Sequence, residues 1–127
     1  MNLFEYEGKQ MMREYGIPVP ESHLITSEDA PAPMAYPFVL KAQVMTGGRG
    51  KAGGVKICEN EADYKKYAHD ILNMEIKGHK VHGLLAEQMM KAVRELYLSI
   101  TPDTVLMEGE SMLVLGQYKD LQKCFHI

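Results

Sequence analysis

The stretch Tyr36-Pro-Phe-Val-Leu-Lys-Ala-Gln-Val-Met-Thr-Gly-Gly-Arg-Gly-Lys-Ala-Gly-Gly-Val55 decides the fold. Apolar residues between Phe38 and Val44 predict a buried strand, which Lys41 interrupts. A second strand is predicted at residues 54–58. The loop between the two strands holds two cations and five glycines: Arg49, Lys51, Gly47, Gly48, Gly50, Gly53 and Gly54. The sequence therefore predicts a hairpin with a positively charged, glycine-rich tip.

Such a tip has two interpretations. A Gly-Gly pair between strands is a common turn signal, and the cations can be solvated. However, glycines also let successive N–H groups point into one concavity that attracts anions. Lys41 favours this second interpretation, because a lysine in an apolar strand is costly unless its ammonium reaches a partner or water. The loop differs from a Walker loop, since the lysine precedes the glycines and no helix follows.

Several stretches together resemble the beta subunit of the succinyl-CoA synthetase (succinate–CoA ligase) family, whose fold is ATP-grasp. The similarity runs in register from Met1 to about Thr101. It rests on the hairpin and on four further motifs: Met1-Asn-Leu-Phe-Glu-Tyr-Glu-Gly-Lys-Gln10, Tyr15-Gly-Ile-Pro-Val-Pro20, Leu84-Leu-Ala-Glu-Gln-Met-Met90 and Arg94-Glu-Leu-Tyr-Leu98. The expected fold class is α/β (α+β): the amino-terminal lobe of an ATP-grasp domain, a mostly antiparallel sheet with two helices. Residues 1–101 would form this lobe, and residues 102–127 a divergent tail without a family match.

The resemblance implies a nucleotide site for ATP or GTP. The implied phosphate ligands are the side chains of Lys41 and Arg49 with the backbone donors of Gly48 and Gly50. Glu87 and Met90 would frame adenine, and Glu95 would bind the ribose hydroxyls, a task that suits a carboxylate because it accepts two hydrogen bonds from a diol. These seven residues position and neutralise the nucleotide, and none is expected to be a chemical catalyst.

The resemblance also implies the reaction and its partners. The parent enzyme makes succinyl-CoA from succinate, CoA and a nucleoside triphosphate, and passes a phosphoryl group through a histidine of the alpha subunit. Mg²⁺ is expected in the parent, but its ligands do not follow Thr101, nor do the remaining beta-subunit domains. We therefore expect this chain alone to be an inactive fragment that can self-associate. The alternatives are a non-catalytic nucleotide-binding or assembly module, or a related ligase that acts on malate.

Composition narrows the class of protein. The chain has 127 residues and a net charge of −3, which does not favour nucleic acid as its main partner. No apolar run reaches membrane-spanning length, and the amino terminus lacks the layout of a signal peptide. Cys58 and Cys124 form neither a metal motif nor a disulfide framework, so Cys58 is expected to be a small buried residue. A reducing cytoplasm is the expected compartment.

The remaining elements are predicted from periodicity and capping. Residues 3–15 predict an amphipathic helix with a capping box from Asn2 to Glu5, its apolar face packed on the sheet. A second helix is predicted after an Asn60 cap, with a core stripe of Tyr64, Tyr67, Ala68, Ile71 and Leu72. Residues 27–35 cannot form a long helix, and residues 75–83, with His79 and His82, predict a solvated turn rather than a metal site. Further strands are predicted at residues 23–26, 84–90, 92–100 and 111–115, and a short helix at 118–125.

Overall fold

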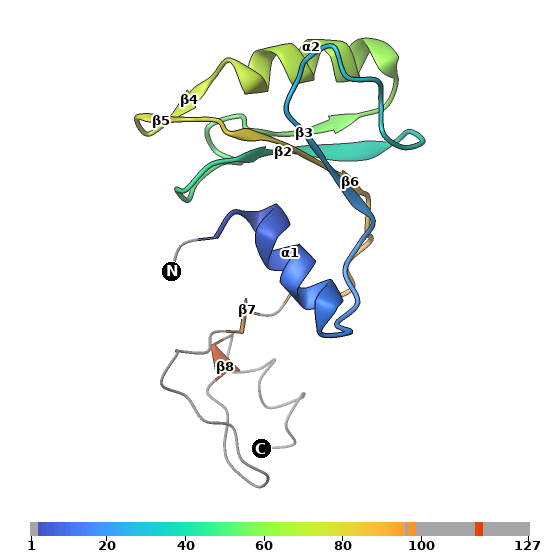
Figure 1. Ribbon diagram of the computed structural model, residues 1–127, viewed down its shortest axis with the longest axis vertical. Helices are drawn as coiled ribbons and strands as arrows, with labels where there is room; N and C mark the ends of the chain where they lie inside the picture. The colour runs from blue at the N-terminus through green and yellow to red at the C-terminus, as the bar shows by residue number, and fades with distance from the viewer. Residues whose placement is uncertain (1–2, 96, 99–113, 116–127) are drawn as a thin grey trace, which may run out of the picture. The chain divides into compact units, whose positions relative to one another are not determined.

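The structure, a computed structural model, describes residues 3–95, 97–98 and 114–115. It divides into two compact units, Met1–Met90 and Lys91–Ile127. The first unit contains the two helices and the main sheet (Figure 1). The predicted α+β class with an antiparallel sheet is therefore confirmed.

The main sheet has four strands, β1 (Ser22–Ile25), β2 (Phe38–Gln43), β3 (Val55–Cys58) and β6 (Gly83–Gln88). Their order is β1-β6-β2-β3, and every neighbouring pair is antiparallel. β2 and β3 are joined by the glycine-rich loop, so the predicted strand, turn and strand hairpin is confirmed. Successive side chains of a strand point to opposite faces of a sheet, and this alternation gives the two faces different chemistry.

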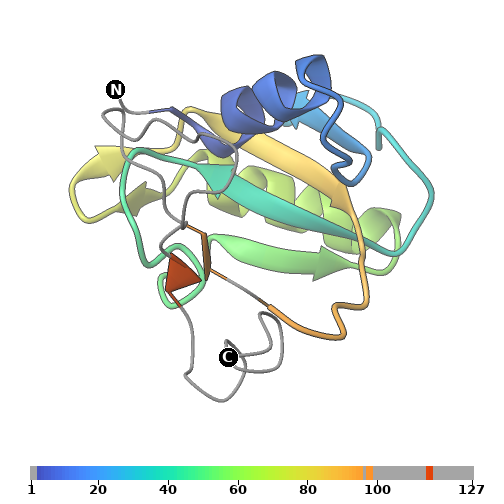
Figure 2. The same ribbon diagram turned by 90° about the horizontal axis from the view of Figure 1, so that it is seen from below.

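One face of the sheet forms the apolar core beneath helix α2 (Glu61–Leu72). Helix α1 (Glu5–Glu14) lies on the opposite side of the sheet (Figures 1 and 2). The Asn60 side chain caps α2, because its Oδ1 accepts a hydrogen bond from the Asp63 N–H at 3.0 Å. The predicted core stripe of α2 is confirmed: three of its residues are buried and two are partly buried against them. The core cluster comprises Ile25, Phe38, Leu40, Ala42, Cys58, Tyr64, Ala68, Ile71, Ile76, Val81, Leu84 and Ala86.

Cys58 is fully buried, as predicted, and burial raises the pKa of its thiol to about 12.

Helix α1 (Glu5–Glu14) differs from the prediction in its cap and in its packing. The helix begins at Glu5, so a capping box from Asn2 to Glu5 is wrong; the Glu7 carboxylate instead accepts the Phe4 N–H at 2.8 Å. No residue of α1 is buried, and Met11 and Met12 are 42% and 46% exposed. Most of the apolar stripe therefore does not pack on the sheet. Polar contacts, such as the Tyr6 N–H bond to Gln43, and a ring stack of Phe4 on His82 hold the helix instead.

Residues 75–83 are not a solvated turn. They contain a small antiparallel hairpin of β4 (Glu75–Ile76) and β5 (His79–Lys80). Ile76 of β4 and Val81, which follows β5, join the core. The sequence analysis missed this hairpin because each strand has only two residues, too few to show alternation. Ile76 is 1% exposed and packs against Gly54, where the glycine-rich loop leads into β3.

Gly54, the last loop residue before β3, has no room for a side chain. A Cβ there would lie 2.9 Å from Ile76 Cδ1 and 3.1 Å from Ala42 Cβ. We expect Gly54→Ala to lower the free energy of unfolding by about 1–3 kcal/mol through overpacking. Chemical denaturation measures this, with Gly47→Ala as control, because a Cβ at Gly47 meets nothing within 4 Å. Equal stability of the two variants would contradict the close packing of β4 under the hairpin.

In the second unit, β7 (Tyr97–Leu98) pairs antiparallel with β8 (Val114–Leu115). Both short strands fall inside predicted strands, at 92–100 and 111–115, although residues 92–95 are not extended in the sheet. The predicted helix at 118–125 lies outside the described residues.

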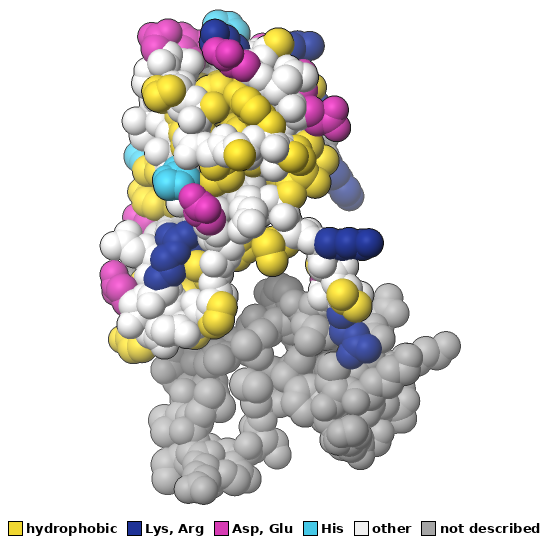
Figure 3. All heavy atoms as spheres, turned by 90° about the vertical axis from the view of Figure 1, so that its right-hand side faces the viewer, with side chains coloured by type: hydrophobic (Ala, Val, Ile, Leu, Met, Phe, Trp, Pro, Cys, Tyr) yellow, Lys and Arg dark blue, Asp and Glu magenta, His cyan; other side chains and the backbone are white. Residues whose placement is uncertain are grey.

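The surface of the described residues carries several large apolar side chains, and Figure 3 shows one face on which such side chains gather among charged ones. Met89 and Met90, directly after β6, are 42% and 65% exposed. Self-association through this region stays a prediction. No helix among the described residues is both long enough and apolar enough to cross a membrane.

Candidate functional site

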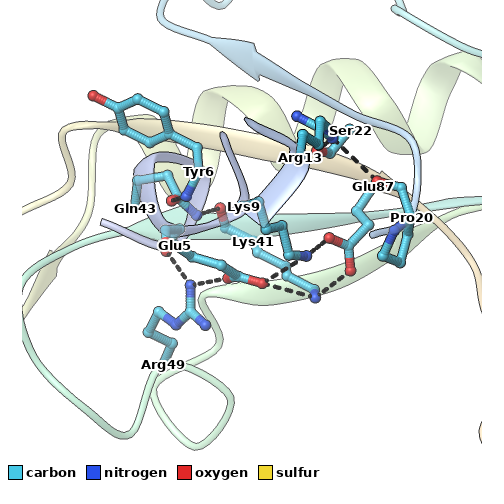
Figure 4. Close-up of polar contacts among 11 residues, drawn as sticks. Glu5, Tyr6, Lys9, Arg13, Pro20, Ser22, Lys41, Gln43, Arg49 and Glu87 are labelled. Atoms are coloured by element: carbon cyan, nitrogen blue, oxygen red, sulfur yellow. Dashed lines mark hydrogen bonds and ion pairs between the residues drawn. The ribbon is translucent and has the colours of Figure 1, made fainter. Parts of the chain in front are cut away.

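The face of the sheet opposite the core carries the charged residues. β2 places Lys41 on this face, and β6 places Glu87 there, because Lys41 pairs with Leu85 while Glu87 pairs with Val39. The two are diagonal cross-strand neighbours, which long side chains can bridge. Lys41 Nζ donates to Glu87 Oε1 at 2.6 Å (Figure 4), so the strand lysine has the partner that its burial requires.

Helix α1 contributes a second carboxylate to the same place. Glu5 Oε2 accepts from Arg49 Nη1 at 2.7 Å, and Glu5 Oε1 accepts from Lys41 Nζ at 3.2 Å and lies 3.1 Å from Lys9 Nζ. Lys9 also forms an ion pair with Glu87. These five residues, Glu5, Lys9, Lys41, Arg49 and Glu87, are called the charged cluster below. It combines three cations with two carboxylates from α1, β2, the loop and β6 (Figure 4).

The cluster perturbs the protonation of its members. Burial alone would raise the pKa of the Glu5 carboxyl, but the hydrogen bond from Arg49 and the charges of Lys41 and Lys9 outweigh it. The pKa of Glu5 is therefore lowered from 4.5 to about 2. Burial lowers the pKa of Lys9, although Glu5 opposes the shift. Glu5 is thus fully ionised at neutral pH and binds Arg49 and Lys41 as an internal anion.

Gln43 holds α1 over the sheet. Its side chain is fully buried on the same face of β2 as Lys41. Its Oε1 accepts the Tyr6 N–H at 3.1 Å, and its Nε2 donates to the Lys41 carbonyl at 3.1 Å (Figure 4). Because Tyr6 follows Glu5 in the first turn of α1, this bond fixes the position of the Glu5 carboxylate.

The glycine-rich loop folds back on itself beside the cluster. The carbonyls of Gly48 and Gly50 accept bonds from Ala52 and Gly53, both at 3.1 Å. Among the described residues the N–H groups of Gly48 and Gly50 have no hydrogen-bond partner, which leaves them available as donors. Gly48 has φ +89°, a conformation that favours glycine.

Two hollows adjoin this loop, and Arg49 lines both. The first has a volume of about 500 Å³, and Glu5, Met45 and Thr46 also line it. The second has a volume of about 700 Å³, with Gly48, Lys51 and Lys77 in its wall.

The other predicted site residues lie further along the chain. Met90 follows β6 and is exposed. Glu95 is exposed and belongs to the second unit. The structure thus brings Lys41, Arg49 and Glu87 together in one cluster. The nucleotide-binding roles of all seven predicted site residues stay predictions.

Sequence reasoning missed Glu5, Lys9 and Gln43 as members of this site. Glu5 and Lys9 are four residues apart and share one face of α1, a spacing that allows an ion pair. That spacing is a usable signal, but it gives no indication of which charges lie across the sheet.

A further hollow of about 650 Å³ lies between residues 28–36 and α2, and it contains none of the predicted site residues. Among the described residues no three His, Cys, Asp or Glu side chains gather where they could hold a metal ion.

The described lobe thus combines an antiparallel sheet, a glycine-rich hairpin that carries Lys41 and Arg49, and the Glu87 carboxylate across the sheet. The sequence pattern of the ATP-grasp domain matches residues 2–114 of this chain. The chain belongs to the ATP-grasp domain family.

The curated relatives are similar in sequence over most of this chain. The succinate–CoA ligase (ADP-forming) subunit beta of Halobacterium salinarum is 45% identical over 121 residues, which are 92% of this chain and 31% of the relative. The protein of the same name from Methanocaldococcus jannaschii is 45% identical over 105 residues, 81% of this chain and 29% of the relative. The chain thus spans about a third of the length of these relatives.

A solved structure shares the fold. It is the dinucleotide forming acetyl-coenzyme A synthetase 1 of Ca. Korarchaeum cryptofilum, in complex with coenzyme A, acetyl-coenzyme A and a phosphorylated phosphohistidine segment. It is 26% identical, with a TM-score of 0.58, and the match covers 74% of this chain and 44% of that one.

Proposed function

We propose that this chain is the nucleotide-binding lobe of a succinate–CoA ligase beta subunit, and that it binds the triphosphate of ATP or GTP at the β2–β3 hairpin. The parent reaction joins succinate and CoA at the expense of the nucleotide. The observation that carries the proposal is the convergence of Lys41 and Arg49 on one carboxylate, beside the available N–H groups of Gly48 and Gly50. The Glu5 carboxylate is itself an anion bound between these two cations.

The roles of the seven site residues follow from this proposal. Phosphates are bound by Lys41 and Arg49 and by the N–H groups of Gly48 and Gly50. Glu87 and Met90 border the adenine, with recognition through the backbone, because the Glu87 carboxylate already binds Lys41 and Lys9. Glu95 binds the ribose.

None of these residues supplies a nucleophile, so the lobe positions and neutralises the nucleotide rather than transferring the phosphoryl group itself. The proposed partners are an alpha subunit and the other beta-subunit domains, and cytoplasm is the proposed compartment. The 127-residue polypeptide alone is proposed to bind nucleotide without making the thioester.

Nucleotide titration of the full chain followed by NMR tests the proposal. We expect binding in the millimolar range, about −4 kcal/mol, with shifts at Lys41, Gly48, Gly50, Glu87 and Glu95 together. Lys41→Ala removes a phosphate ligand and is expected to weaken binding by about fivefold or more. Lys65→Ala on the exposed face of α2 removes the same charge away from the site and should leave binding unchanged. Shifts confined to other residues would refute the assignment.

A further inference from the structure

Lys77 occupies an unusual backbone position in the turn between β4 and β5. It has φ +51° and is followed by Gly78 with φ +80°. Two consecutive positive φ angles in a two-residue hairpin loop are typical of a type I′ turn, in which Asn-Gly is strongly preferred. Among the described residues Lys77 is the only non-glycine residue with a positive φ. Local sterics disfavour a lysine in this conformation, and such strained positions cluster at functional sites.

The turn is fixed beside the glycine-rich loop. Ile76, which precedes Lys77, is 1% exposed, and its Cδ1 would lie only 2.9 Å from a Cβ at Gly54. At the other end of the loop, Lys77 Nζ would lie 3.4 Å from a Cβ at Gly48. The ammonium group therefore lies against the backbone of the same glycine whose N–H is available as a donor. Both groups line the 700 Å³ hollow together with Arg49 and Lys51.

The charges around the loop are unequally compensated. In the charged cluster, Glu5 and Glu87 already neutralise much of the charge of Lys9, Lys41 and Arg49. By contrast, no carboxylate among the described residues pairs with Lys51 or Lys77. The triphosphate of a nucleotide carries several negative charges, which are more than the net positive charge of the cluster can neutralise. Both of these lysines line the 700 Å³ hollow beside the loop.

We propose that Lys77 is a further phosphate-binding residue, which reaches over Gly48 from the β4–β5 turn to bind the polyphosphate of a nucleotide held by the hairpin. This inference rests on the proposed function, because it assigns one more ligand to the same site. In this arrangement the β4–β5 turn and the glycine-rich loop bind the phosphates from two sides. Lys77 acts by charge, and its position depends on the packing of Ile76 against Gly54.

Lys77→Asn tests the proposal, because asparagine suits the left-handed position of the turn, so the ammonium is removed without straining the backbone. The matched control is Lys80→Gln, which removes the same charge from exposed β5 without touching the hollow. Calorimetric or NMR titrations of the full chain use ATP, AMP and inorganic tripolyphosphate as probes. We expect Lys77→Asn to weaken ATP and tripolyphosphate about five- to tenfold, and AMP by no more than about twofold. Lys80→Gln should change none of the three by more than about twofold.

The outcomes separate this inference from the proposed function. If the unmodified chain binds ATP and Lys77→Asn binds it equally well, the Lys77 assignment is wrong and the nucleotide site stands. Equal weakening by Lys77→Asn and Lys80→Gln would show only long-range attraction and would also overturn the assignment. If the chain binds tripolyphosphate but not ATP, the proposed function fails, and the tripolyphosphate comparison still decides the role of Lys77. Binding of neither probe overturns both.

Discussion

Replacing Glu5 with glutamine is expected to lower the free energy of unfolding at neutral pH by about 2–3 kcal/mol and to flatten its dependence on acid. The ionised carboxylate binds Arg49, Lys41 and Lys9 at once, and glutamine keeps its shape without its charge. The side chain of Glu5 is 22% exposed, so water screens these pairs only partly. When the Glu5 charge is removed, Glu87 is the one carboxylate left in the cluster, and the three cations beside it repel one another.

The sign of the pH effect follows from the pKa. Glu5 has a pKa of about 2 in the folded chain, below its ordinary value of 4.5. A group with a depressed folded pKa stabilises the folded state above its unfolded pKa, and this contribution is lost as pH falls towards the folded value. The unmodified chain should therefore lose the contribution of Glu5 between about pH 5 and pH 2, and Glu5→Gln should lack that part of the loss.

Urea unfolding at a series of pH values between about 2 and 7 measures both effects. Glu14→Gln is the matched control, because Glu14 lies on the exposed end of the same helix and, within the part of the chain that the structure describes, its carboxylate accepts a hydrogen bond from Gln10 alone. The control should follow the unmodified chain across the range. An acid dependence in Glu5→Gln as steep as that of the unmodified chain would show that the cluster does not hold α1.

The hairpin was predictable from sequence because its signals are local. A run of apolar residues in β2 and five glycines in the next stretch suffice to indicate strand, turn and strand. The Asn60 cap of α2 was predictable for the same reason, since a cap bonds within a few residues.

The charged cluster was not predictable in this way. Glu5 was assigned to a local capping box, whereas its partners Lys41 and Arg49 are 36 and 44 residues away. Which side chains meet across the sheet depends on the path of α1, and that path depends on the Gln43 bond to Tyr6. Lys77 was read as part of a polar turn because two-residue strands leave no periodic pattern. Helical periodicity likewise does not tell whether the apolar stripe of α1 is buried.

Gln43→Ala is expected to destabilise the chain by about 3 kcal/mol, because the side chain is fully buried and forms two hydrogen bonds. Its loss leaves a cavity under α1, and the Lys41 carbonyl and the Tyr6 N–H each lose a partner. Gln88→Ala on the exposed end of β6 is the control and should change stability little. Denaturant unfolding gives the stabilities, and hydrogen exchange at the Tyr6 amide shows directly whether α1 loosens. A Tyr6 amide as protected as in the unmodified chain would contradict this role for Gln43.

The double variant then tests whether Gln43 acts through Glu5. If Gln43 positions the first turn of α1, its removal also weakens the ion pairs of Glu5, so the two losses overlap. The sum of the single-variant losses from Gln43→Ala and Glu5→Gln should exceed the loss in the double variant by about 1 kcal/mol or more. Additive losses would mean that the buried amide and the charged cluster stabilise the chain independently. Coupled losses would mean that the amide beneath α1 places an anion between the two cations proposed to bind phosphate.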